Sequence, residues 1–170
     1  MNWNKPDFSL LPEIVCDEHP EYLCLYRTAW EQVFRHAVRD SRLPAGEYMD
    51  EGTALPHLWL WDSCFMALLC KYAGGRLPGL KTLDNLYTIM YHTQSGIFPV
   101  HHADNPPLFA WVEYENLKFN GDLERIERIL GQECYLQKHW EFFEHTRYGT
   151  RHPFAFLLDS LQRNEDGYLW

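Results

Sequence analysis

The chain has 170 residues, a length that suits one domain and is short for two. It is 46% hydrophobic and 23% charged, which is typical of a soluble globular protein. The formal net charge of −9 argues against a nucleic-acid partner or an anionic membrane surface, because both require a basic face on the protein.

The apolar residues recur with the period of amphipathic helices, and little of the chain alternates in the way that strands do. Residues 1–20 are expected to be an irregular N-terminal segment. The pattern then predicts helices over residues 22–39, about 62–73, 78 to just before 96, 106–120, 122–131 and about 134–148. Gly74-Gly75 and Asn120-Gly121 are helix-stop signals, and Asp122 is a predicted N-cap.

Two similar loops follow successive pairs of predicted helices. Ser-Gly-Ile-Phe-Pro at 95–99 and Glu-Asp-Gly-Tyr-Leu at 165–169 each place a turn glycine before two large apolar residues. Helical hairpins joined by similar loops are typical of an α/α toroid or solenoid. We therefore expect an all-α fold in a single domain over residues 1–170.

The aromatic content is high, at 16%, and includes seven tryptophans. Such an excess suits a dense core, and it also suits a carbohydrate cleft, where flat C–H faces of a sugar pack on indole rings. The stretch LWLWDSCF at 58–65 places Asp62 directly after Trp61. The sequence leaves two interpretations open: Asp62 caps a helix beside two core aromatics, or it accepts hydrogen bonds from sugar hydroxyls on an aromatic floor.

The cysteines and histidines give no sign of disulfide, metal or nucleophile chemistry. The five cysteines form no CxxC pair, and Cys64 and Cys70 fall in an apolar helical pattern where a thiol behaves as a small hydrophobe. No histidine has HxxxH spacing with a partner acid, so we expect neither metal nor cofactor. No signal peptide or membrane span is evident either, which favours a cytoplasmic setting.

WLWDSCFMAL at 59–68, followed by SGIFPVHHADNPPLFAWVEY at 95–114, resembles the (α/α)6-barrel glycoside hydrolases of the trehalase and family 63 glucosidase group. In those enzymes a Trp-Asp pair opens an inner helix, and a polar residue before Pro-Pro-Leu opens the next one. Where trehalases carry arginine, glutamate and tyrosine before this pair, the chain has Ala54, His57 and Trp59, so the bacterial family 63 branch is more similar. The resemblance implies part of an (α/α)6 toroid.

The resemblance also implies a substrate-binding set. Trp59, Trp61 and Asp62 match residues that shape the subsite for the terminal sugar. Asn105 stands where relatives have a glutamine that binds sugar hydroxyls, although Asp104-Asn105 also fits a cap for the following helix. His101 lies in the same loop. Asp62 is not expected to act as a general acid, because a helix N-terminus favours its ionised form and lowers its pKa.

The implied reaction is metal-free inverting hydrolysis, which needs two carboxyl groups astride the scissile bond. In the family the acid lies in a Ser-Gly-x-Asp motif that this sequence lacks, and the base lies further on. We therefore expect the N-terminal portion of a glycosidase barrel, with a carbohydrate partner, no catalytic residue of its own and an apolar face that favours self-association. The alternative is a non-catalytic helical interaction module or an inactive gene remnant.

Overall fold

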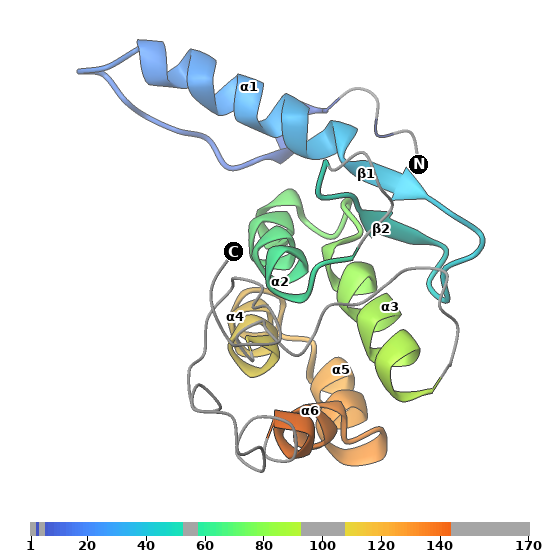
Figure 1. The fold of residues 1–170 in the computed structure, drawn as a ribbon. Helices are drawn as coiled ribbons and strands as arrows, with labels where there is room; N and C mark the ends of the chain where they lie inside the picture. Colours follow the sequence, from blue (N-terminus) through green and yellow to red (C-terminus); the bar gives the residue numbers. More distant parts are fainter. Residues whose placement is uncertain (1–2, 4–5, 53–57, 93–107, 144–170) are drawn as a thin grey trace, which may run out of the picture.

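The computed structural model describes residue 3 and residues 6–52, 58–92 and 108–143, and these residues are mostly helical (Figure 1). The α-helices are α1 (Glu21–Arg35), α2 (Leu60–Cys70), α3 (Gly79–Tyr91), α4 (Phe109–Asn120), α5 (Leu123–Glu127) and α6 (Tyr135–Phe143). The shorter elements are 3-10 helices η1 (Phe8–Leu10) and η2 (Lys71–Ala73), π-helix η3 (Arg128–Gln132), and strands β1 (Ala37–Arg39) and β2 (Glu47–Met49). The prediction of a helical fold class is confirmed at this level.

The predicted first helix is wrong at its C-terminal end. It stops at Arg35, and the three residues Ala37–Arg39 pair antiparallel with β2, where Val38 lies opposite Tyr48. Residues 37–39 form a strand of this hairpin and do not extend α1 by another turn. The hairpin buries the aromatic side chain of Tyr48 in the core. Strands of three residues are too short to show the alternation from which strands are predicted.

The predicted helix stops and the predicted N-cap are confirmed. Gly74 and Gly121 both adopt left-handed conformations, with φ of +58° and +70°, directly after η2 and α4. The Asp122 side chain accepts a hydrogen bond of 2.9 Å from the backbone N–H of Arg125, which caps α5. Between α5 and α6 the chain passes through η3 and through Cys134, whose φ is +53°.

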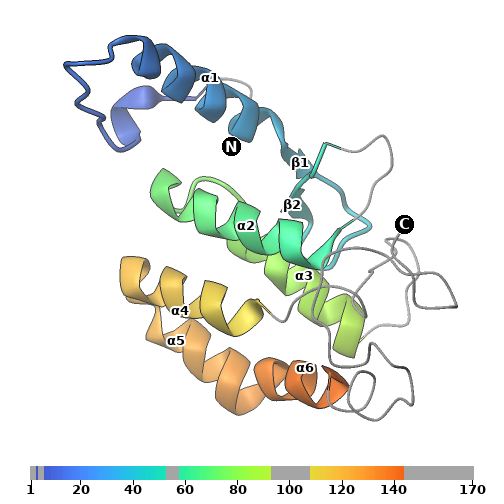
Figure 2. The same cartoon turned by 60° about the vertical axis from the view of Figure 1, so that its left-hand side comes forward.

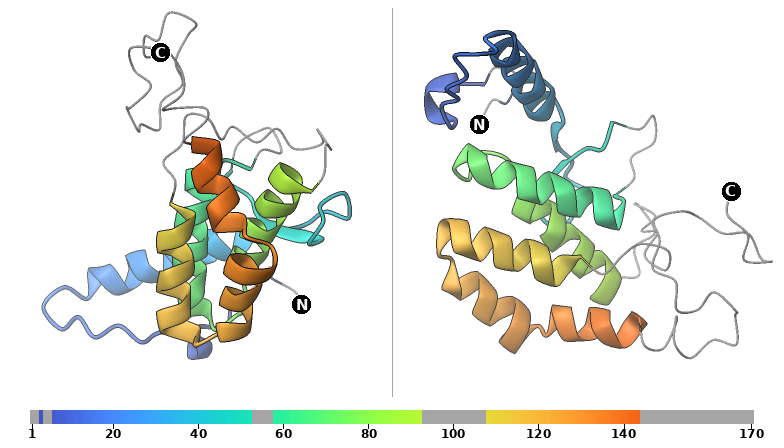
Figure 3. Two further views of the ribbon diagram at one scale, coloured as in Figure 1. Left: turned by 90° about the horizontal axis from the view of Figure 1, so that it is seen from below. Right: turned by 90° about the vertical axis from the view of Figure 1, so that its left-hand side faces the viewer.

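Helices α2 to α6 form two successive antiparallel hairpins. In Figures 2 and 3, α2 and α4 lie side by side and run in the same direction, while α3 and the α5–α6 segment return in the opposite direction. Gly79 allows the close approach within the first hairpin, because a Cβ there would lie 2.5 Å from Cys70 Cβ. No helix of the described residues has both the length and the apolar character of a bilayer span.

The larger of two hydrophobic clusters lies between these helices. Its most deeply buried members are Leu58, Leu60, Cys64, Leu83, Leu86, Tyr87, Phe109, Val112 and Ile129. The second cluster joins the N-terminal segment and α1 to the end of α2, through Trp30, Phe34, Met49, Cys70 and Leu77 among others. All five cysteines are free, and Cys64 and Cys70 are buried, as the sequence predicts. Burial raises the pKa of the Cys70 thiol to about 12.

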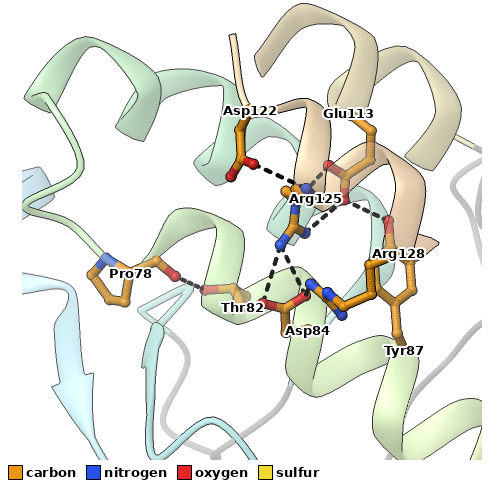
Figure 4. A network of polar contacts seen from close by, with 8 residues as sticks. All are labelled: Pro78, Thr82, Asp84, Tyr87, Glu113, Asp122, Arg125 and Arg128. Atoms are coloured by element: carbon orange, nitrogen blue, oxygen red, sulfur yellow. Dashed lines mark hydrogen bonds and ion pairs between the residues drawn. The ribbon is translucent and has the colours of Figure 1, made fainter. Parts of the chain in front are cut away.

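An ionic network centred on the buried pair Arg125 and Glu113 links the two hairpins, with Asp84 and Arg128 partly exposed at its edge (Figure 4). The Arg125 guanidinium donates to both oxygens of Glu113, at 2.8 and 2.7 Å, and to both oxygens of Asp84, at 3.0 and 3.1 Å. The Tyr87 hydroxyl donates to Glu113 at 2.9 Å, and Arg128 adds a contact of 3.0 Å to Asp84. Since every charged side chain in this network has a partner of opposite charge, we infer that the network has a structural role and links α3, α4 and α5.

Candidate functional site

The first turn of α2 carries three of the sequence-predicted site residues. The helix begins at Leu60 with Trp59 as its N-cap residue, two residues earlier than predicted. Asp62 therefore lies inside the first turn and is not the N-cap, which corrects that interpretation of LWLWDSCF. Trp61 and Asp62 are both partly exposed, so either side chain is open to a ligand.

The side chain of Glu51, which lies outside the helix, caps the N-terminus of α2. Its two carboxylate oxygens each accept a hydrogen bond of 2.9 Å from the backbone N–H of Trp59. The Ser63 hydroxyl donates to Glu51 Oε1 at 2.7 Å. One side chain that follows β2 thus fixes the turn that presents Trp59, Trp61 and Asp62.

The acid–base properties of the two carboxyl groups are both perturbed. Burial raises the pKa of Glu51 to about 8; the nearby charges of Asp62 and Asp50 act in the same direction, and the hydrogen bonds from Ser63 and Trp59 oppose it. Burial also raises the pKa of Asp62, which corrects the expectation that the helix N-terminus would lower it. At this site the loss of water outweighs the hydrogen bond from the backbone N–H of Asp62 itself. At neutral pH a protonated Glu51 therefore lies beside Asp62.

A row of aromatic rings begins next to Asp62 and crosses from α2 to α4. Trp61 packs edge-to-face on Phe65, with ring centroids 5.6 Å apart and an interplanar angle of 66°. Phe65 packs in the same manner on Trp111 of α4, at 6.5 Å and 79°. Phe65 and Trp111 are each nearly half exposed. The row offers apolar ring surface, and Phe65 places one of its rings beside the carboxyl groups of Glu51 and Asp62.

The carboxyl groups line a cavity of about 310 Å³ between α1 and α2. Its walls are Gln32, Val33, His36, Glu51, Asp62, Phe65 and Met66. The His36 ring is held in place, because its Nδ1–H donates to the Asp50 carbonyl at 2.8 Å. Gly52 packs against the same ring: its φ is +77°, and a Cβ there would lie 2.7 Å from His36 Cε1.

Of the predicted site residues, Trp59, Trp61 and Asp62 lie at the start of α2, and of these three Asp62 lines the cavity, while Trp61 packs on Phe65. The other two, Asn105 and His101, lie outside the described residues. Glu51 is the residue that sequence reasoning missed. No local pattern links it to a helix start eight residues further along the chain, and Glu51-Gly52 has the form of an ordinary turn. Within the described part of the chain, no group of three His, Cys, Asp or Glu side chains could hold a metal ion.

Comparison of the chain with protein families, with curated proteins and with solved structures finds no match. The interpretation of the site therefore depends on its own geometry and on the motifs of the sequence.

Proposed function

We propose that this chain is the sugar-binding portion of an (α/α)6 glycoside hydrolase-like domain, similar to the trehalase and family 63 group. The observation that carries the proposal is the first turn of α2. There Trp61 heads a partly exposed aromatic row, and Asp62 lines a cavity together with the partly buried carboxyl group of Glu51. A pyranose has apolar C–H faces and a rim of hydroxyls, and this surface offers a partner for each.

The arrangement of the helices supports the toroid part of the proposal. An α/α toroid repeats antiparallel hairpins, and helices that occupy equivalent places in successive hairpins lie next to each other and run in parallel. Helices α2 and α4 have this relation (Figure 2). In the proposal they are neighbouring inner helices. The five free cysteines are compatible with the reducing, cytoplasmic setting that we infer from the sequence.

Each residue of the site has a proposed role in binding and none in bond cleavage. Asp62 accepts hydrogen bonds from sugar hydroxyls, and Trp61 packs on an apolar face of the ring, with Trp59 completing the floor. Glu51 positions this turn, since both its oxygens are engaged by Trp59 N–H and one also by Ser63 Oγ. Asn105 and His101 remain in the proposal as further hydroxyl ligands on the evidence of the sequence alone.

The proposal is tested by titrating the 15N-labelled chain with glucose and with glucono-δ-lactone at millimolar concentrations. Amide shifts should cluster in residues 58–66 and at Glu51. Asp62→Asn should weaken binding about tenfold, the value of one charge-assisted hydrogen bond. The matched control is Asp17→Asn, since Asp17 is an exposed residue outside the site. Saturable shifts that are equal in both variants, or no shifts, would contradict the proposal.

A second candidate function, a helical interaction module, is favoured by the exposed apolar face of α2 and α4. Five large side chains on α2, α4 and the adjoining η2 are between 43% and 57% exposed: Phe65, Tyr72, Trp111, Tyr114 and Phe119. An apolar face of this kind promotes association, with itself or with another protein. Sedimentation at increasing protein concentration tests it. A concentration-dependent dimer that Trp111→Lys dissociates, without sugar-dependent shifts, would favour this second function.

A further inference from the structure

A second and larger cavity lies at the opposite end of α2 from Asp62. Its volume is about 650 Å³, and it is enclosed by the C-terminal ends of α2 and α4, the start of α3, both strands and Trp3. Asp62 and Cys70, which mark the two ends, are separated by about 12 Å along the helix axis. The cavity is therefore distinct from the candidate sugar site, and nothing said about it depends on the function proposed above.

The charge that lines this cavity is opposite to the charge of the chain. Four basic residues line it, against the single carboxylate of Glu47, although the chain as a whole has a net charge of −9. The four are Arg39, Lys71, Arg76 and Lys81. Glu47 contacts both Arg39, at 3.8 Å, and Lys81, while Glu115 lies 3.2 Å from Lys71. Asp7 also interacts with the charge of Arg76. Even with these three carboxylates counted, the four basic groups are in excess.

Arg76 has hydrogen-bonding capacity that the protein does not use. Its Nη2 donates to the Leu10 carbonyl at 2.5 Å, and its own carbonyl accepts from Trp3 Nε1 at 2.9 Å, so the residue is fixed in place. Its Nη1 is buried and has no hydrogen-bond partner among the described residues. A buried guanidinium N–H without an acceptor is costly. Arg76 lines the cavity, so its charge favours an anion there, and Nη1 gains an acceptor when the guanidinium turns toward that anion.

The N-terminus of α3 opens into the same space. Pro78 is its N-cap residue and gives no side-chain hydrogen bond, while the first helical bond runs from Thr82 N–H to Pro78 O at 2.9 Å. The Thr82 hydroxyl donates to the same carbonyl (Figure 4) and accepts from Met49 N–H, so it does not cap the helix either. Pro78, Leu80 and Lys81 line the cavity. The positive end of a helix of 13 residues thus meets the cluster of basic side chains.

We propose that this cavity binds a small organic phosphate, with the phosphate held by Arg76, Lys81 and the amides of Leu80 and Lys81 at the start of α3, since the Gly79 N–H is engaged by the Cys70 sulfur, and with the organic part packed between Trp3 and Phe119. The volume is much larger than a phosphate ion needs, and the remaining walls are largely apolar, with Leu77 and Leu80 beside the two aromatic rings. The ligand class is therefore a phosphate ester that has a ring or another apolar body.

Phenyl phosphate is a suitable probe, with inorganic phosphate and phenol as its two halves. Titration of the 15N-labelled chain should shift the Trp3 indole N–H and the amides of residues 74–82, with phenyl phosphate binding more tightly than either half. Lys81→Gln should weaken its binding three- to tenfold. Lys138→Gln, on α6 and away from the cavity, should leave the affinity unchanged, and so should Asp62→Asn.

A further variant, Arg76→Gln, should abolish binding. Its melting curve separates lost binding from lost folding, because Arg76 also holds Leu10. The proposal is overturned if phenyl phosphate causes no shift, if sodium chloride of equal ionic strength removes the shifts, or if Lys81→Gln and Lys138→Gln behave alike.

Discussion

Replacing Glu51 with glutamine should make the protein more stable at alkaline pH. Burial raises the pKa of Glu51 from 4.5 to about 8 in the folded chain. Between these two pH values the folded state holds a proton that the unfolded state has released, so the free energy of unfolding falls as the pH rises and levels off above pH 8. Glutamine has the shape of the protonated acid and does not titrate. It therefore removes this loss of stability.

The size of the effect follows from the pKa shift. One pKa unit corresponds to 1.36 kcal/mol, so a shift from 4.5 to about 8 sets a ceiling of about 5 kcal/mol. Glu51 is only partly buried, and solvent screening lowers the effect. We expect the Glu51→Gln variant to gain about 2 kcal/mol over the wild type between pH 5 and pH 9. The glutamine amide oxygen still accepts from Trp59 N–H and Ser63 Oγ.

Urea unfolding at pH 5, 7 and 9 measures this difference, because the midpoint and slope give the free energy at each pH. Glu124→Gln is the control, since Glu124 is exposed on α5 and its replacement should leave the pH dependence unchanged. Parallel stability curves for wild type and Glu51→Gln would refute the reasoning. A variant that is less stable than the wild type at pH 9 would show that the ionised Glu51 carboxylate stabilises the fold.

Two further predictions concern the packing of the helices. Gly79→Ala should destabilise the protein by about 1–3 kcal/mol, because the new Cβ would lie 2.5 Å from Cys70 Cβ. The control is Gly131→Ala, where a Cβ meets nothing within 4 Å, and it should be neutral or stabilising. Thermal denaturation measures both, and equal melting temperatures of the two variants would contradict this prediction. Glu113→Ala should cost about 3–5 kcal/mol in urea unfolding, because it leaves Arg125 with only part of its buried counter-charge; a loss below 1 kcal/mol would show that Arg125 is solvated.

The features that the sequence predicted correctly are those with a local cause. The glycines that end α2–η2 and α4, and the aspartate that caps α5, act within one helical turn of their own position. The amphipathic periods of the helices are local in the same sense, and they were sufficient to predict the helical fold class.

The features that the sequence did not predict depend on residues brought together by folding. Glu51 caps α2 through Trp59, which is eight residues further along the chain, and Arg125 pairs with Asp84, which is 41 residues before it. The pKa of Asp62 was predicted in the wrong direction, because the helix dipole is visible in the sequence and the burial of the carboxyl group is not. Strands β1 and β2 are too short to have a readable pattern.

The central claim, that the first turn of α2 is a sugar-binding floor, is tested most directly by saturation-transfer difference NMR with glucose. Irradiation of the protein's aromatic protons should transfer saturation to the C–H protons of the pyranose. The transfer should be lost in Trp61→Ala and kept in Trp140→Ala, which removes a tryptophan of α6 that is 52% exposed. If the wild-type chain shows no transfer, or if both variants retain it equally, the sugar-binding account of Trp61 and Asp62 is wrong.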